Sequence, residues 1–163
     1  MESIKPFPTP ISTTTKLDAD LNGEKVDETT YSGMVGSLMY LTTSRPDIVF
    51  DVSLYARAQS DPRASHLVNI KKIPCYLKGS NNLCLWYPKD GSISLVGYTD
   101  ADYAGYLVDR KSTSGMAQFL GPSLVSWGSR KQNSTSTSTT EVEYIGNGLM
   151  CILCSVLKIP PRR

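Results

Sequence analysis

The spacing of apolar residues along the chain predicts helices in its first half. A helix is expected from about Thr30 to Thr43, with a start that Asp27 or Thr29 can cap. Two more helices are expected, from Pro46 to about Gln59 and from Pro62 to about Leu77, each opened by a proline. The apolar side of the first helix is formed by Met34, Val35, Leu38, Met39 and Leu41.

Pro74 conflicts with the third predicted helix. A proline inside a helix removes a backbone hydrogen bond and clashes with the preceding turn, at a cost of about 3 kcal/mol. We therefore expect a kink or an early end at Pro74. The same helix carries His66, the only histidine, which we interpret as a surface or packing residue rather than a catalytic base.

The second half of the chain has the pattern of short strands followed by one helix. Strands are predicted from Leu83 to Tyr87 and from Leu95 to Thr99. Met116–Leu120 and Leu124–Trp127 are predicted to pair as a hairpin across a Gly-Pro-Ser turn. After a loop rich in Ser and Thr, a last helix is expected from Glu141 to about Leu157. The order of these elements indicates an α+β or α/β fold.

Two aspartates at the end of the Leu95–Thr99 strand are the clearest candidates for chemistry. The period of two along a strand places Tyr98, Asp100 and Asp102 on one face. Carboxylates held at a strand end suit Mg²⁺, because the strand fixes them while the end stays open to substrate. The alternative is a polar turn, which the spacing alone favours.

Glu141 is the third candidate carboxylate. At about 100° per residue it lies about 60° from the centre of the apolar stripe of the last helix, whereas Glu143 lies about 140° away. A helix packed on the sheet could therefore bring Glu141 next to Asp100. The alternative is capping, because Ser138 to Glu141 and Thr140 to Glu143 both fit a capping box. The stripe consists of Val142, Ile145, Leu149, Ile152, Leu153 and Val156.

Composition and charge narrow the function classes only slightly. The 163 residues are 40% hydrophobic, which is typical of one globular domain, or of a small domain with an appendage. The net charge of +2 neither requires nor excludes a nucleic-acid partner. Two basic pairs, Arg110-Lys111 and Arg130-Lys131, are candidate phosphate contacts, with a solvated surface as an equal alternative. No apolar run is long enough to span a membrane, and the N-terminus lacks a signal pattern, so we expect an intracellular location, cytoplasmic or nuclear.

Several motifs in order resemble the Pol polyproteins of copia-type retrotransposons. YTDADYAG, DRKSTSG, SWGSRKQ and STTEVEY are similar to their RNase H region. Upstream, YSGMVGSLMYLTTSRPDIVFDVS and the HLVNIKKI segment resemble the helical end of the reverse transcriptase. The resemblance covers roughly Tyr31 to Ile145. It implies a mixed sheet flanked by helices, and four carboxylates that bind two Mg²⁺ ions and hydrolyse the RNA strand of an RNA–DNA hybrid.

The resemblance assigns roles to particular residues. Asp100 matches the first catalytic carboxylate and metal ligand, Glu141 the second, and Asp102 is a further candidate ligand. The third and fourth carboxylates of the family would follow Arg163, so we expect a truncated RNase H-like domain that binds Mg²⁺ weakly and is catalytically incomplete alone. The polymerase palm and its aspartate motif have no counterpart here, so DNA synthesis is not expected.

The expected organisation has three parts. Residues 1–29 form a disordered leader, residues 30–81 a helical segment resembling the end of reverse transcriptase, and residues 82–163 the truncated RNase H-like domain, with one helix packed on its sheet. The expected partners are an RNA–DNA hybrid or other nucleic acid, and further copies of the chain through exposed sheet edges. The second interpretation is a non-enzymatic module, retained from a transposon, that binds nucleic acid or protein.

Overall fold

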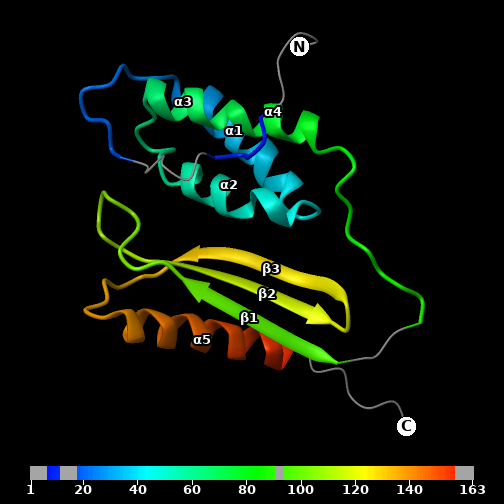
Figure 1. Cartoon of the computed structure of the whole chain (residues 1–163). Coiled ribbons are helices and arrows are strands. Elements are labelled where there is room, and N and C mark those ends of the chain that lie inside the picture. The colour runs from blue at the N-terminus through cyan, green and yellow to red at the C-terminus, as the bar shows by residue number, and fades with distance from the viewer. Residues whose placement is uncertain (1–6, 12–17, 91–93, 157–163) are drawn as a thin grey trace. The chain divides into compact units, whose positions relative to one another are not determined.

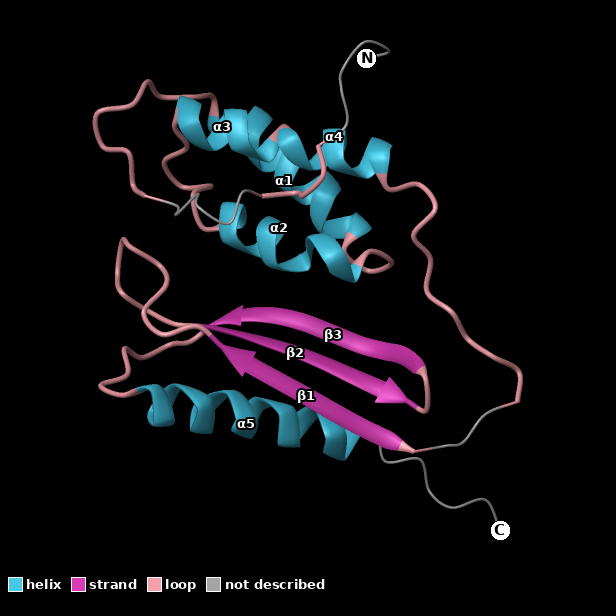
Figure 2. Ribbon diagram, viewed as in Figure 1, coloured by secondary structure: helices cyan, strands magenta, loops and turns pink. Residues whose placement is uncertain are grey.

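The chain folds as two compact units, Met1–Cys84 and Leu85–Arg163, in a computed structural model that describes residues 7–11, 18–90 and 94–156 (Figure 1). The first unit is helical, and the second is a sheet with one helix (Figure 2). The fold is therefore α+β, as one of the two expected classes. Along the chain, the boundary between the helical and sheet units lies between Cys84 and Leu85, whereas the sequence placed it at residue 82.

The helical unit is built around the apolar sides of its first helices. Its elements are α1 (Glu28–Leu41), the 3₁₀ helix η1 (Pro46–Ile48), α2 (Val49–Ala56), α3 (Ala64–Ile70) and α4 (Lys72–Gly79). The cap predicted for α1 is confirmed, because the carboxylate of Asp27 accepts a 2.7 Å hydrogen bond from the backbone N–H of Thr30. Buried apolar side chains from α1, α2, α3 and α4 include Tyr31, Val35, Leu38, Val52, Tyr55, Ile70 and Ile73.

The third predicted helix is two helices, and the expected kink at Pro74 is wrong in position. The helical run breaks at Lys71, and Pro74 is the third residue of α4. The first N–H groups of a helix have no acceptor within it, so a proline in the first turn loses little. Ile70 and Ile73 on either side of the break are both fully buried, which keeps the two helices on one core.

Part of the expected leader is attached to the helical unit. Arg63 donates from its guanidinium to the carbonyl oxygen of Gly23 over 3.0 Å. The imidazole of His66 lies 2.9 Å from the carbonyl oxygen of Asp18 through Nε2, and its Nδ1 accepts the backbone N–H of Arg63. His66 is buried, which agrees with a packing role. Residues 1–6 and 12–17 of the leader lie outside the described residues.

The second unit contains an antiparallel sheet of three strands, in the order β1 (Leu95–Ala101), β2 (Thr113–Leu120) and β3 (Ser123–Lys131). The resemblance implied a mixed sheet, but all strand pairs in the described sheet are antiparallel. Each connection runs directly to the neighbouring strand, whereas a parallel pair would need a crossover. The strand predicted from Leu83 to Tyr87 is also wrong. This stretch forms no ladder, although the Tyr87 hydroxyl donates to the carbonyl oxygen of Leu124 over 2.8 Å.

The predicted hairpin is present, with longer strands than expected, and Gly121 occupies the left-handed region (φ 57°) in its turn. The last helix, α5 (Thr139–Val156), packs on β1 and β2. Gly146 permits the close approach, because a Cβ there would lie 3.1 Å from Thr99 Oγ1 and 3.4 Å from Ser114 Oγ. Val142 is 1% exposed at the same interface. The rest of the predicted stripe, from Leu149 onward, has side chains outside the described residues.

Candidate functional site

The candidate residues come together at one end of the sheet, which we call the sheet end. Here β1 ends, β2 begins, β3 ends and α5 begins, and the loop of residues 102–112 connects β1 to β2 (Figure 1). The antiparallel register fixes this arrangement, since Ala101 is paired with Ser114 and Ser114 with Arg130. The sheet end carries Asp100, Asp102, Arg110, Lys111, Arg130, Lys131 and Glu141.

Asp100 is exposed, near the end of β1. Its neighbours Thr99 and Ala101 face α5, because both are close to the position of a Cβ on Gly146. The alternation along a strand then places Asp100 on the opposite face. Tyr98 shares this face and meets Phe119 edge to face, with ring centroids 5.8 Å apart. The residue paired with Asp100 is Gly115, which has no side chain to cover the carboxylate.

Asp102 organises the loop after β1. One carboxylate oxygen accepts the backbone N–H of Thr113, and the Asp102 backbone N–H donates to the Thr113 carbonyl oxygen over 3.1 Å. The other carboxylate oxygen lies against Gly105, where any added Cβ would overlap it. Ala104 between them has a positive φ of 50°. Asp102 is therefore in the polar turn that the spacing favoured, and the Asp-x-x-Gly pattern is the sequence signal for it.

Glu141 takes part in capping α5. Its carboxylate accepts the backbone N–H of Thr137 over 2.8 Å and the Thr137 hydroxyl over 3.1 Å. Its own backbone N–H donates to Ser138 Oγ over 3.2 Å. Of the two capping boxes that the sequence allows, the Ser138–Glu141 box is formed by half, because the Glu141 carboxylate bonds to Thr137 instead of the Ser138 N–H.

The phase of α5 does not favour Glu141 over Glu143. The two lie about 100° on either side of Val142, the buried residue between them. Both glutamates are exposed. The preference for Glu141 depends on a stripe that continues from Leu149 to Val156, where the side chains lie outside the described residues. The pairing of Asp100 with Glu141 stays a prediction.

The four basic candidates are used differently. Lys131 forms a 2.5 Å ion pair with Asp109, and its ammonium lies 4.6 Å from the centre of the Tyr106 ring. Burial would raise the pKa of Asp109, but the hydrogen bonds from Lys131 and from the Lys111 backbone outweigh it, so that pKa lies below its usual range. Lys131 thus fastens the loop to β3. Arg110 and Arg130 are exposed, and Lys111 is half-buried.

The carboxylates of the sheet end fit Mg²⁺ only in part. Asp102 and Glu141 each use a carboxylate oxygen for a backbone N–H, whereas Asp100 is open to solvent. Among the described residues, no group of three or more His, Cys, Asp or Glu side chains is arranged to hold a metal ion. Asp100 is therefore the residue of this set that best fits a metal ligand.

Comparison with known proteins decides the origin of the chain. It is 39% identical to the Pol polyprotein of transposon RE1 from Arabidopsis thaliana over 88% of its length, and 38% identical to that of transposon TNT 1-94 from Nicotiana tabacum over 89%. The chain belongs to the copia-type retrotransposon Pol polyproteins. It spans about a tenth of these polyproteins, 10% of the first and 11% of the second.

The copia-type resemblance inferred from the motifs is thus confirmed. A shorter relative, the secreted RxLR effector protein 161 of Plasmopara viticola, is 39% identical over 71% of the chain, which covers 82% of that protein. No family model and no solved structure matches the chain. In the described part of the copia-type chain, no helix is long and apolar enough to cross a membrane.

Proposed function

We propose that this copia-type chain is an RNase H-like fragment that contacts nucleic acid through the sheet end and is catalytically incomplete alone. The observation that carries the proposal is that Asp100, Arg110 and Arg130 are all exposed at the sheet end. Asp100 lies on the open face of the sheet, and Arg130, which is paired with Ser114, lies on the face that carries α5. An antiparallel sheet with one helix packed on it supports an RNase H-like assignment, and so does the relationship to Pol polyproteins.

The chemistry assigned to the sheet end is limited by its carboxylates. Asp100 would hold Mg²⁺, which, when bound in such sites, activates water and stabilises the leaving oxygen in hydrolysis of a phosphodiester. Two-metal chemistry needs several oxygen ligands around both ions. Asp102 instead holds the loop and Glu141 caps α5. Substrate contact without efficient cleavage is the function that these roles support.

The basic residues supply the contacts to nucleic acid in this proposal. Arg110 and Arg130 can each donate to a phosphate in a bidentate manner, and neither guanidinium is buried. Lys111, which follows Arg110 in the chain, adds positive charge. Such contacts fix the position of a duplex without reading its sequence, and their strength falls as the salt concentration rises. An RNA–DNA hybrid is the ligand that the family relationship favours.

The test measures the fluorescence anisotropy of a short labelled RNA–DNA hybrid at several salt concentrations. We expect Arg110→Glu and Arg130→Glu each to weaken binding by about tenfold and to lower the salt dependence. Lys89→Glu, the same charge change at an exposed residue before β1, should have a much smaller effect. Asp100→Asn should leave binding intact or strengthen it, since it removes a negative charge. Equal loss in all three charge reversals would overturn the proposed interface.

The alternative function, binding of another protein chain or of a second copy, is favoured by one observation. β1 has exposed apolar side chains, Leu95, Val96 and Tyr98, and no other described strand pairs with its outer edge. β3 is better protected, because Tyr87 bonds to the carbonyl oxygen of Leu124 in that strand. Unpaired strand edges with apolar side chains promote association.

This alternative predicts association that depends on β1. Sedimentation velocity should show dimers or larger species at micromolar concentration, and Val96→Lys on the β1 strand should disperse them. Val125→Lys on β3 serves as the matched control and should change the distribution less. A monodisperse monomer over the same concentration range would remove the support for association through β1.

A further inference from the structure

A groove of about 780 Å³ lies on the helical unit, between α1 and α4. Its volume is typical of a site for a small molecule. The floor is apolar and comes from both helices, while the basic residues stand around it. The residues that line it are Met34, Leu41, Arg45, Lys71, Pro74, Cys75, Leu77, Lys78 and Asn81.

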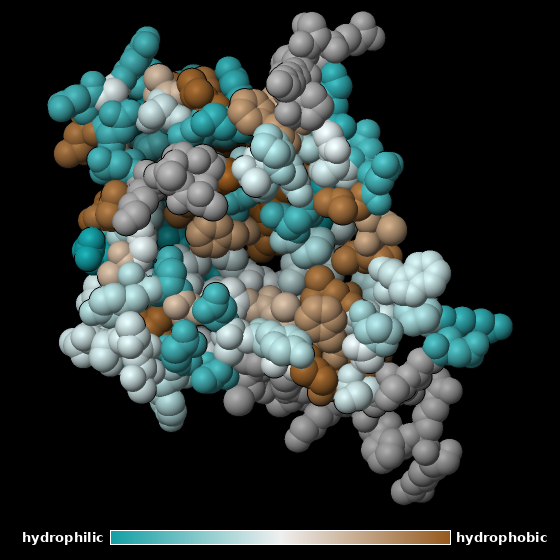
Figure 3. All heavy atoms as spheres, viewed as in Figure 1, coloured by the Kyte–Doolittle hydropathy of each residue, from teal (hydrophilic) through white to brown (hydrophobic). Residues whose placement is uncertain are grey.

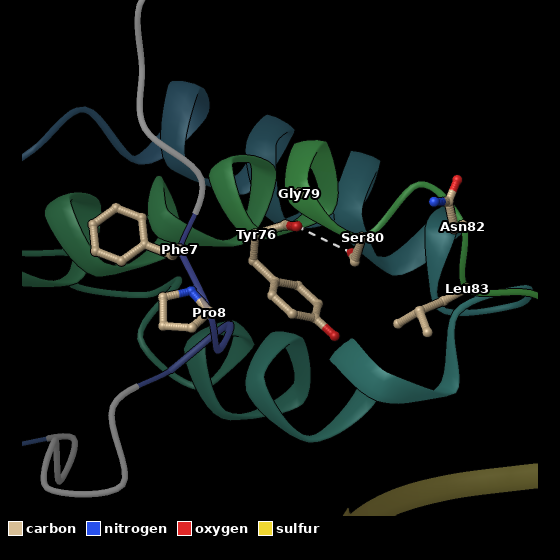
Figure 4. Close-up of a pocket in the computed structure, with 7 residues that line it drawn as sticks. All are labelled: Phe7, Pro8, Tyr76, Gly79, Ser80, Asn82 and Leu83. Carbon is tan, nitrogen blue, oxygen red and sulfur yellow. Dashed lines mark hydrogen bonds between the residues drawn. The ribbon is translucent and has the colours of Figure 1, made fainter.

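One end of this groove is fixed by a hydrogen-bond network. Arg45 donates to Ser80 Oγ over 2.6 Å, which ties the chain after α1 to the end of α4. The Ser80 hydroxyl in turn donates to the carbonyl oxygen of Tyr76 over 3.0 Å (Figure 4). Arg45 is also paired with Asp47 at 2.7 Å. This end of the groove is therefore rigid and close to Lys78 and Asn81.

The groove has a direction. Leu41 lies seven residues after Met34 on α1, a separation of about 10 Å along the helix. Lys78 on α4 lies seven residues after Lys71, which stands at the break before that helix. Arg45, Lys78 and Asn81 stand at one end, and Lys71 lies toward the other. An extended alkyl chain of about ten carbons matches the length of this floor and fills part of the groove.

The charge around the groove selects an anion. The described residues that line it include three cationic side chains and no acidic one. Arg45 is paired with Asp47, so Lys71 and Lys78 are the lining residues that would hold the anion. Lys71 and Lys78 are exposed, and Asn81 adds amide donors at the rigid end. None of the described residues that line the groove is aromatic, so they offer no surface on which a nucleic-acid base could stack. An apolar floor with a cationic end instead suits an alkyl chain that carries a carboxylate.

A second cavity of the helical unit does not share these properties. It has a volume of about 700 Å³, and its lining includes Phe7 and Pro8, which lie to one side of Tyr76 (Figure 4). The Tyr76 hydroxyl is bonded to Asp47 at 2.8 Å. The lining residues that the structure describes here include no cationic side chain. Of these two cavities, the α1–α4 groove is the one that combines an apolar floor with positive side chains around it.

We propose that the α1–α4 groove binds a medium-chain fatty-acid anion. The carboxylate lies at the end formed by Lys78 and Asn81, and the alkyl chain lies between Met34 of α1 and Pro74 of α4. The helical unit would then have a ligand of its own, independent of the nucleic-acid contacts proposed for the sheet end.

Isothermal titration calorimetry of the full chain with decanoate, below its micelle concentration, tests this proposal. We expect saturable binding with a dissociation constant of about 1 mM or tighter. Decyltrimethylammonium has the same alkyl chain with a positive head group and should bind at least about tenfold more weakly, because the rim is cationic. Equal binding of the two amphiphiles, or no binding of decanoate, would overturn the proposal.

Variants locate the site. Lys78→Glu should weaken decanoate binding by about tenfold through its charge, and Met34→Glu should do so by placing a carboxylate in the apolar floor. Lys89→Glu is the matched charge control outside the groove and should bind decanoate as the parent chain does. Circular dichroism checks that each variant keeps its helices. Displacement of decanoate by an RNA–DNA hybrid, or an equal loss in Lys89→Glu, would contradict the assignment.

Discussion

Asp51 on α2 is a buried carboxyl, only 5% exposed, in the core of the helical unit. Burial raises its pKa to about 7, and repulsion from Asp47 adds to the shift. The unfolded chain releases this proton near pH 4, whereas the folded chain keeps it until about pH 7. The contribution of protonated Asp51 to the free energy of unfolding is therefore fully present below about pH 4 and is lost as the pH rises to about 7.

Asp51→Asn should remove this pH dependence. The neutral amide avoids burial of a charge. At pH values above 7, the thermal midpoint of the variant should therefore be higher than that of the parent chain, by an amount corresponding to a few kcal/mol at most. Asp47→Asn is the control with the opposite sign. The hydrogen bond from Arg45 lowers the pKa of Asp47, so its charged form stabilises the fold and the amide should lower the midpoint at neutral pH. A parallel response of both variants would contradict this explanation.

Gly105 and Gly36 differ in the space that a larger side chain would have. An alanine Cβ at Gly105 would overlap the Asp102 carboxylate, whereas a Cβ at Gly36 on α1 meets nothing within 4 Å. Gly105→Ala should lower the free energy of unfolding by about 1–3 kcal/mol, because the loop bond to Thr113 is disturbed. Gly36→Ala should raise it by about 0.5–1 kcal/mol. Denaturant titration of both variants gives the comparison, and a gain in Gly105→Ala would refute the role of Asp102.

At the scale of elements, the sequence predicted what local signals determine. The Asp27 cap, the burial of Val35 and Leu38 and the hairpin at Gly121 all depend on residues a few positions apart. Met39 and Leu41, which the sequence placed on the apolar side of α1, are exposed. The Leu83–Tyr87 strand was wrong because β propensity alone cannot supply a partner strand. The break at Lys71 was missed because the apolar spacing continues across it, from Ile70 to Ile73.

A substitution of Pro74 tests whether this proline strains α4. A proline inside a continuous helix would make Pro74→Arg stabilising by several degrees, given about 3 kcal/mol at stake. Because Pro74 lies in the first turn of α4, we expect a change in the thermal midpoint of less than about 2 °C. A rise of several degrees would show that the proline does strain the helix. Calorimetric scans of the two proteins decide between these outcomes.

At the scale of the whole molecule, the sequence named residues that the fold brings to one end of the sheet, but not what each carboxylate does there. Asp100 and Asp102 look alike in the strand pattern. Their difference comes from Thr113 and Gly105, partners that only the folded loop brings to Asp102. Glu141 could be placed by the helical period or by the capping pattern, and the contact with Thr137 follows the second.

These roles lead to the prediction on activity. The chain alone should show no Mg²⁺-dependent cleavage of a labelled RNA–DNA hybrid above background, because Asp102 and Glu141 are engaged in backbone bonds and Asp100 by itself cannot position two metal ions. Fusion to the adjoining RNase H region of a complete copia-type polyprotein should give measurable cleavage. That activity should disappear with Asp100→Asn, since this carboxylate is the one that fits a metal ligand.

The same fusion distinguishes the remaining carboxylates. Glu141→Gln and Glu143→Gln differ by two positions on α5 and lie on either side of Val142, so loss of cleavage in only one of them identifies the helix residue that acts with Asp100. Asp102→Asn should retain activity, because an amide oxygen can still accept the Thr113 N–H. Robust cleavage by the unfused chain would contradict an incomplete site. Activity that survives Asp100→Asn but not Asp102→Asn would show that the catalytic aspartate is the second of the two.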